Sequence, residues 1–509
     1  MQIYDAEKCF DKLWASECFN DIFKNGFRND KLALLYNINK SAKVAVKTST
    51  GITERIVIKD TIMQGTVWGS LLCTSTVDML GKISYSTPQT LYQYKGVPIP
   101  PLGMVDDIIC VTNVENSEHM NNLINTFIES KNLRLSGQKC YQIHIGNGHQ
   151  SCPKLRVHEQ PMKVAKKEKY LGDMIDQSSS IQATIDSRIS KGKGINTGIM
   201  SILNEIPLGK HRMHIAMKLR EVMLLNGILY NSEAWHGLTE THVKTLQSID
   251  EDFLRRVLKA HRKTPLEFLY LETGAVPIKW ILAQRRINFL KCILSKDSTE
   301  LVLKVFEAQK QDPTPGDFIK LVERDMLELD ITMKNIEESS KVDLKKALKV
   351  SASNASFVGL KKKLMKHKKV KHIQYDCLKM QPYLRSENLQ AEERQTITAL
   401  RSKCVRSVKT NFSTMHKKRL NCPLNCNQEN PYIDTQEHIL ICNKLNISNP
   451  SKLVIKGVFG SLVDQEEIGI LFAKFMRQRT RQLDELNNLP GDILDQSTLL
   501  QGAAVVYDI

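Results

Sequence analysis

The sequence predicts an α+β fold, with the strands near the amino end and helices after them. Short runs rich in β-branched residues alternate with helical patterns through residues 1–180. From about residue 181 to 400, apolar residues recur at steps of three and four, which is the helical period. The stretch GMVDDIICVT, residues 103–112, sets two adjacent aspartates between apolar residues, which indicates a turn between two buried arms.

The elements of the first 180 residues follow from local patterns. Residues 3–23 read as the end of a strand that continues into a helix with one apolar face. Residues 42–60 read as two strands around Thr50 and Gly51. Residues 140–147 and 169–175 read as further short strands.

The helical part begins with two strongly periodic segments, residues 214–235 and 242–262. A second helical stretch, residues 311–400, is richer in charge and contains KKKLMKHKKVKH at 361–372, with seven lysines and no acid. Such a run is most often a solvated face, but it also suits phosphate contact or a nuclear-import signal. These interpretations stay open.

Composition narrows the class of protein. The 509 residues carry 72 Lys and Arg against 55 Asp and Glu, a net charge of +17. This excess favours a polyanionic partner, of which nucleic acid is the commonest, although a basic protein without that role remains the alternative. The sequence has no apolar run of membrane-spanning length and starts with polar residues, so we expect an intracellular protein with no membrane partner. The twelve cysteines are mostly isolated, as reduced thiols are.

The two aspartates need a reason to lie beside buried strands. A hairpin with Asp106 and Asp107 at its tip lets both arms pack while the carboxylates protrude at the sheet edge; a plain polar turn is the alternative. Asp5 lies where the first strand gives way to a helix, a place that also suits an N-cap. Acidic strand ends on one sheet can converge on two divalent cations about 3.5–4 Å apart, and Mg²⁺ prefers such oxygen ligands.

Five segments, in this order, resemble palm motifs A to E of the reverse transcriptases of non-LTR (LINE-type) retrotransposons. They are YDAEKCFDKLW (4–14), MQGTVWGSLLCTSTVD (63–78), GMVDDIIC (103–110), LRLSGQKCYQIHIG (133–146) and KKEKYLGDMI (166–175). Residues 226–237 and 266–294 are similar to thumb and post-thumb sequence of the same family. The resemblance implies a palm, an antiparallel sheet with packed helices, together with partial fingers over 1–180. It also implies a helical thumb over 181–310, a basic helical connector over 311–400, a zinc knuckle over 401–450 and a helical tail over 451–509.

The resemblance also implies roles for individual residues. Asp5 matches the motif A aspartate and Asp106 and Asp107 the motif C pair, so that Asp5 and Asp106 would bind two Mg²⁺ ions with Asp107 beside them. Lys139 matches the motif D lysine that protonates the leaving pyrophosphate, with a surface lysine as the alternative. The residues that match nucleotide- and template-binding positions are Phe10, Gln64, Gly65, Tyr170, Leu171 and Gly172. Phe10 also suits the core of its helix.

The cluster Cys422-x3-Cys426-x11-His438-x3-Cys442 supplies four soft ligands within a short segment. Tetrahedral zinc coordination needs this number and type of ligand, and a closed four-ligand site is structural. Scattered structural cysteines are the alternative. The cluster resembles the C-terminal CCHC knuckle of the same retrotransposon proteins.

The family likeness implies an RNA-directed DNA polymerase whose partners are an RNA template, a DNA primer, target DNA and deoxynucleoside triphosphates, with a nuclear location. The chain differs from the family in three respects: Met1 lies four residues before Asp5, so fingers motifs are missing; no nuclease pattern is found; and Ser70 stands where proline is frequent. We therefore expect weak nucleotide binding and little processive synthesis. The alternatives are a catalytically inactive, nucleic-acid-binding retroelement remnant and, less favoured, a host protein that has reused the fold.

Overall fold

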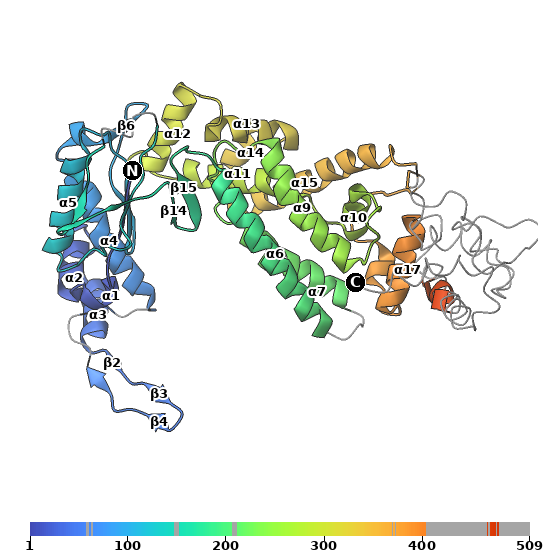
Figure 1. The fold of residues 1–509 in the computed structure, drawn as a ribbon, viewed down its shortest axis with the longest axis horizontal. Helices are drawn as coiled ribbons and strands as arrows, with labels where there is room; N and C mark the ends of the chain where they lie inside the picture. The colour runs from blue at the N-terminus through green and yellow to red at the C-terminus, as the bar shows by residue number, and fades with distance from the viewer. Residues whose placement is uncertain are drawn as a thin grey trace, which may run out of the picture. The chain divides into compact units, whose positions relative to one another are not determined.

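The computed structural model describes residues 1–57, 61–62, 65–146, 152–205, 211–368, 370–371, 373–403, 466, 469–474 and 476–477. The chain divides into two compact units (Figure 1). Unit 1 contains residues 1–187, 234–238 and 292–321, and unit 2 contains residues 188–233, 239–291 and 322–509. The predicted α+β class is confirmed, since the structure combines small sheets with many helices.

Unit 1 is built around a five-stranded sheet in the order β13-β10-β1-β9-β8. Its strands are β1 (Gln2–Asp5), β8 (Leu102–Met104), β9 (Asp107–Cys110), β10 (Tyr141–Gln142) and β13 (Lys163–Val164). Strand β1 pairs antiparallel with both β9 and β10, whereas β10 and β13 are parallel. The centre of the sheet therefore joins segments that lie more than a hundred residues apart in sequence.

The two faces of this sheet bury different residues. Tyr4 and its cross-strand partner Ile108 belong to the main core, with apolar residues of helices α2 (Ala15–Lys24), α4 (Val67–Ser84) and α5 (Ser117–Ser130). Ile3 and its partner Ile109 point the other way and pack with Ile143 in a smaller cluster. This alternation follows from the two-residue period of a strand.

Three predicted elements differ in detail from the structure. The helix expected over residues 3–23 divides into α1 (Cys9–Lys12) and α2, because Trp14 is extended and bridges Thr61 from a distant segment. The strand expected over 140–147 is only the two residues of β10. The strand expected over 169–175 is instead a hairpin of β14 (Lys167–Tyr170) and β15 (Asp173–Asp176), because Leu171 and Gly172 both adopt positive φ, as a two-residue hairpin turn requires.

The strand pair predicted over 42–60 is confirmed as an extended ribbon (Figure 1). In it β2 (Lys43–Val44) pairs with β5 (Ile56–Val57), and β3 (Lys47–Thr48) pairs with β4 (Gly51–Ile52). The other short elements of unit 1 are α3 (Asp30–Lys40), a 3-10 turn (Pro88–Thr90), β6 (Tyr92–Tyr94), β7 (Val97–Ile99), β11 (Arg156–Val157), β12 (Gln160–Pro161) and α12 (Leu301–Gln311).

The described residues of unit 2 are helical, as the periodicity predicted. The remaining helices of the chain are α6 (Gln182–Glu205), α7 (Arg212–Leu219), a π-helical turn (Arg220–Leu225), α8 (Asn226–Ile228), α9 (Glu240–Val257), α10 (Leu266–Thr273), α11 (Ile278–Leu294), α13 (Phe318–Leu329), α14 (Met333–Glu338), α15 (Lys341–Leu364), α16 (Pro382–Arg385) and α17 (Ala391–Arg401). Across the part of the chain that the structure describes, none of the helices has the length and apolar character needed to cross a membrane.

Buried charges join the helices of unit 2. Arg220 donates to both carboxylate oxygens of Asp250 at 2.6 and 2.7 Å, and the Tyr270 hydroxyl donates to the same carboxylate at 2.9 Å. Glu272 accepts hydrogen bonds from Tyr375 at 2.5 Å and from Arg401 at 2.9 Å. Removing one member of such a pair leaves a buried charge unpaired, so these contacts fix the packing of α9, α10 and α17.

Candidate active site

Two of the predicted catalytic aspartates lie directly opposite each other on the central strands. Asp5 ends β1 and Asp107 begins β9, and the antiparallel register pairs them as cross-strand partners. Directly opposite residues in such a ladder have Cα atoms about 4.5–5.5 Å apart and side chains on the same face. The carboxylates of Asp5 and Asp107 therefore share one edge of the sheet.

The turn before Asp107 is one residue earlier than predicted. Met104 pairs with Asp107, so the two-residue tip is Val105 and Asp106 rather than Asp106 and Asp107. Val105 has a φ of 63°, as the first position of a type II′ hairpin turn requires. A β-branched residue pays a steric cost in that left-handed region, so the tip that holds Asp106 is a strained turn.

Lys139 approaches the same edge from the loop before β10. Its Nζ lies 3.4 and 3.3 Å from the two carboxylate oxygens of Asp5. The backbone fixes this loop, because the Ser136 amide donates to the Asp5 carbonyl at 2.9 Å and the Lys139 amide donates to the Ser136 carbonyl. The Lys139 side chain is 67% exposed and that of Asp5 is 22% exposed, so the pair is open to solvent and to a ligand.

The electrostatics of this edge reflect the crowding of negative charge. Burial raises the pKa of Asp107, and the charges of Asp106 and Asp5 raise it further, whereas Lys139 acts to lower it. The charge of Asp106 also acts on α4: the pKa of the Cys73 thiol is raised, first by its hydrogen bond to Cys9 and by burial, and to a smaller extent by Asp106. The charges of Asp5 and Asp106 thus both act on Asp107.

The hairpin β14–β15 lies beside this edge. Tyr170 packs against the cluster of Ile3, Ile109 and Ile143. Burial raises the pKa of Tyr170 to about 12, and the charge of Asp107 contributes to the same direction. Leu171 and Gly172 form the turn of this hairpin, with φ of 45° and 94°. Of the predicted binding residues Tyr170, Leu171 and Gly172, Tyr170 therefore lies close to the acidic edge.

Three of the predicted nucleotide- and template-binding residues, Phe10, Gln64 and Gly65, come from the first two motif segments. Phe10 lies on α1, half-buried against the main core, and its carbonyl accepts from the Ile62 amide, so its core interpretation holds whether or not it also contacts a sugar. Gly65 is exposed with a φ of 83°, one residue before the Thr66 cap of α4. Gln64 lies outside the described residues.

The metal predictions are constrained by ligand geometry. Among the residues that the structure describes, no group of three His, Cys, Asp or Glu side chains is arranged to hold a metal ion. Asp5 and Asp107 lie at the edge and Asp106 lies in the adjoining turn, and this carboxylate set fits Mg²⁺, which proteins usually hold by one or two carboxylates together with substrate phosphates and water. The predicted zinc ligands Cys422, Cys426, His438 and Cys442 lie outside the described residues.

One positioning contact escaped the sequence analysis. Gly103 on β8 faces Val77 on α4 so closely that a Cβ at position 103 would lie 2.1 Å from the Val77 Cγ1. Helix α4 thus lies directly against the hairpin that carries Asp106 and Asp107. A glycine within a strand is the signal that such a close approach leaves in a sequence.

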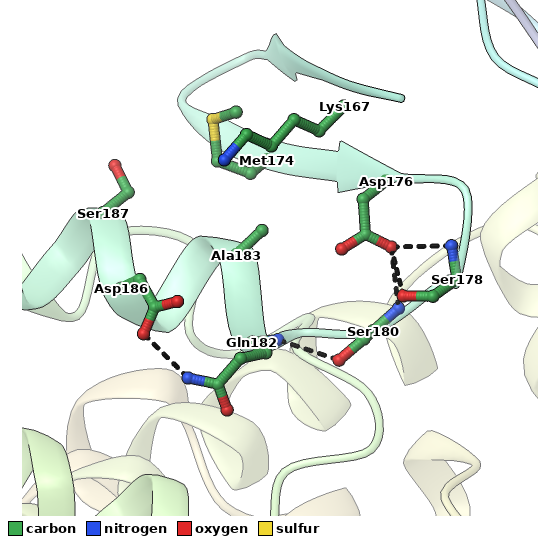
Figure 2. Close-up of a pocket in the computed structure, with 9 residues that line it drawn as sticks. All are labelled: Lys167, Met174, Asp176, Ser178, Ser180, Gln182, Ala183, Asp186 and Ser187. Atoms are coloured by element: carbon green, nitrogen blue, oxygen red, sulfur yellow. Dashed lines mark hydrogen bonds between the residues drawn. The ribbon is translucent and has the colours of Figure 1, made fainter. Parts of the chain in front are cut away.

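A separate cavity of about 490 Å³ lies where β15 leads into α6 (Figure 2). The Asp176 carboxylate accepts from the Ser178 amide at 2.8 Å and its hydroxyl at 2.5 Å, and from the Ser180 amide at 3.3 Å. Gln182 donates to Asp186 at 2.7 Å on the helix beside it. These bonds order the turn between hairpin and helix, and hydrogen bonding to Ser178 and Ser180 lowers the pKa of Asp176 despite an opposing effect of burial.

Comparisons with known proteins give no family. No protein-family model matches the chain, and no curated protein matches its sequence. Among solved structures, the chain is similar to telomerase from Candida albicans in complex with a fragment of telomeric RNA, with 10% identity and a TM-score of 0.28. The match covers 64% of this chain and 49% of the telomerase, so the chain spans about half of that protein's length. A likeness at this level carries no argument about function.

Proposed function

We propose that the chain is the palm and thumb of an RNA-directed DNA polymerase of the non-LTR retrotransposon type. The observation that carries the proposal is the pairing of Asp5 with Asp107 at one sheet edge, with Asp106 in the adjoining turn and Lys139 on Asp5. These four residues come from three separate motifs, and they are the residues to which the family resemblance gives a role in nucleotidyl transfer. In this proposal residues 1–180 form the palm, residues 181–310 the thumb and residues 311–400 the connector.

The proposed reaction joins a deoxynucleotide to a primer. The primer 3′ hydroxyl loses its proton to solvent and its oxygen bonds to the α-phosphorus. The bond from that phosphorus to the bridging oxygen of the β-phosphate breaks, and pyrophosphate leaves. Asp5 and Asp106 would hold two Mg²⁺ ions, which when bound supply charge neutralisation for the phosphates. Asp107 would lie beside the ions and contact them less. Lys139 would donate a proton to the pyrophosphate oxygen, a role that its exposure and its position on Asp5 suit.

Two other groups of residues complete the proposal. Phe10 would lie under the sugar, Gly65 and Gln64 under the new base pair, and Tyr170 to Gly172 against the primer. The cysteine and histidine cluster at 422–442 would bind one zinc ion as a structural knuckle. These roles rest on the family resemblance.

Primer extension on poly(rA)/oligo(dT) with Mg²⁺ tests the proposal. Asp5→Asn and Asp106→Asn should each lower extension by about 10²-fold or more, because they remove charge that positions the phosphates. Asp78→Asn is the matched control: its side chain is 61% exposed on α4 and its ion pair is with Lys82 only four residues away, so extension should stay within about twofold. Equal extension by the wild-type chain and by Asp106→Asn would refute the enzyme proposal.

The second candidate is a nucleic-acid-binding remnant without catalysis. It is favoured by the lysine run: Lys361, Lys362, Lys363, Lys366, Lys368 and Lys371 are all exposed at and beyond the end of α15. Salt-sensitive RNA or DNA binding with no extension, unchanged by Asp106→Asn, would support this candidate over the first.

A further inference from the structure

Helices α2 and α3 of unit 1 expose a set of aromatic rings with cations on them. Phe23 is 47% exposed, and Phe27 and Tyr36 are each 40% exposed. Arg28 lies over the ring of Phe23 at 4.9 Å, and Lys40 lies over the ring of Tyr36 at 5.8 Å. We call Phe23, Phe27, Arg28, Tyr36 and Lys40 the aromatic–cation face.

The fold brings these residues together through a tight helix end. Gly26, with a φ of 92°, ends α2, and the Phe27 amide turns back to donate to the Ile22 carbonyl at 3.2 Å. This is the Schellman arrangement, which returns the chain towards the helix it has left. The ring of Phe19, one turn before Phe23, meets the ring of Tyr36 edge-on at 5.4 Å. This ring contact joins α2 to α3, which lie beside each other (Figure 1).

The charge around these rings is strongly positive. Residues 22–48 contain six cations, Lys24, Arg28, Lys31, Lys40, Lys43 and Lys47, against a single acid, Asp30. All six are exposed. A protein-binding patch of this kind is usually depleted in lysine at its centre, whereas a surface that binds single strands combines a positive track with aromatic rings on which bases stack. A duplex keeps its bases stacked on each other, so it leaves the rings without a partner.

We propose that the aromatic–cation face binds single-stranded nucleic acid, on elements distinct from the edge that holds Asp5, Asp106 and Asp107. Bases stack on Phe23 and Tyr36 while Arg28 and Lys40 turn from the rings to the adjoining phosphates. Lys43 in β2 and Lys47 in β3 extend the positive track along the ribbon. The face gives the chain a place to hold unpaired template or displaced strand, which goes beyond the proposed polymerase chemistry.

Fluorescence anisotropy of the full chain with labelled 20-nucleotide oligo(dT) and with a 20-base-pair duplex tests this proposal. The double variant Phe23→Leu and Tyr36→Leu keeps apolar side chains but removes the rings, so single-strand affinity should fall about tenfold for each ring while duplex affinity stays unchanged. Leu34→Ala is the matched control, because Leu34 is 61% exposed on the same helix α3 but has no ring; its affinity should equal that of wild type.

A second variant tests the cations without touching the rings. Arg28→Gln with Lys40→Gln should lower the slope of log affinity against log salt by about 1.4, since each lost phosphate contact on a single strand contributes about 0.7. Single-strand affinity equal to wild type in both double variants would overturn the proposal, and so would equal loss on single strand and duplex. Asp106→Asn should leave single-strand binding unchanged while it abolishes extension, so failure of the polymerase proposal and failure of this one give different results.

Discussion

The contact between Gly103 and Val77 predicts a large effect of one added methyl group. In Gly103→Ala the new Cβ would lie 2.1 Å from Val77 Cγ1 and 3.3 Å from Val77 Cβ. Val77 is 5% exposed and lies within a helix, where a β-branched side chain has essentially one rotamer and cannot turn away. Helix α4 or the hairpin must therefore move, and overpacking of this kind costs about 1–3 kcal/mol.

The same movement should displace the acidic edge that holds Asp5 and Asp107. Gly103 pairs with Ile108, the residue after Asp107, so displacement of β8 moves Asp107 relative to Asp5. We expect extension to fall together with stability in Gly103→Ala. Val77→Ala alone should cost about 2–3 kcal/mol, since it removes two buried methyl groups and leaves a cavity.

The double variant distinguishes a steric contact from a general effect. In Gly103→Ala with Val77→Ala the new methyl occupies the space that the old ones left, so the double variant should be more stable than the sum of the two by about 1–3 kcal/mol. Urea titration, with hydrogen exchange of peptides 67–84 and 102–110 as the readout, measures the change in the free energy of unfolding for each variant. A Gly103→Ala chain as stable as wild type, or strictly additive costs, would refute the reasoning.

Three other perturbations have definite expected outcomes. Gly274→Ala should destabilise unit 2 by about 3 kcal/mol, since its Cβ would lie 2.4 Å from the Met380 amide nitrogen. Gly237 has a similar φ of 61° but nothing within 4 Å of an added Cβ, so Gly237→Ala should destabilise unit 1 by only about 1 kcal/mol, and comparable thermal shifts in the two variants would contradict this. Burial raises the pKa of Glu251 to about 7 from an ordinary value of 4.5, so the folded state holds the proton more tightly. The stabilisation from this proton is complete below about pH 4.5 and is lost as pH rises through 7, which lowers the free energy of unfolding by on the order of 1–2 kcal/mol after allowance for solvent screening. Urea titrations at pH 5 and 8 measure this difference, and Glu251→Gln should abolish it. Asp107→Asn should raise the free energy of unfolding, measured in urea, by up to about 1 kcal/mol because it removes a like-charge pair; a lower free energy of unfolding would count against the crowding of charge at the edge. Millimolar Mg²⁺ should stabilise wild type but not Asp106→Asn, because Asp5 and Asp106 would hold the ions.

Local sequence patterns predicted the presence of helices and strands better than the residues at which they begin and end. The turn near Asp106 and the strand pair around Thr50 follow from residues within ten positions, and both are present. The break before Trp14 was not predictable in this way, because the bridge that holds Trp14 extended comes from Thr61, beyond the reach of a helical pattern. Likewise, the tip of the hairpin lies one residue early because cross-strand register, not the polarity of the aspartates, decides which residues turn.

The candidate site likewise combines features that the sequence predicts with features that depend on the pairing of distant strands. The residue types at positions 5, 106, 107 and 139 were readable from motif order, but their geometry depends on β1 lying between β9 and β10, a pairing that joins segments about a hundred residues apart. The close approach of Gly103 to Val77 left only a glycine as its trace. The two units also interleave in sequence, since residues 234–238 and 292–321 return to unit 1, and a composition-based boundary has no means to detect such a return.

The energetic cost of the acidic edge bears on what it is for. Two carboxylates directly opposite on neighbouring strands repel each other, and Asp106 adds a third charge nearby. Lys139 offsets little of this, because its side chain is 67% exposed and an ion pair that open to solvent contributes about 1 kcal/mol at most. A sheet selected for stability alone would have asparagine or threonine at one of these positions. The fold instead keeps its negative charges together at the end of its central strands, which is the arrangement that a site for cations and phosphates requires.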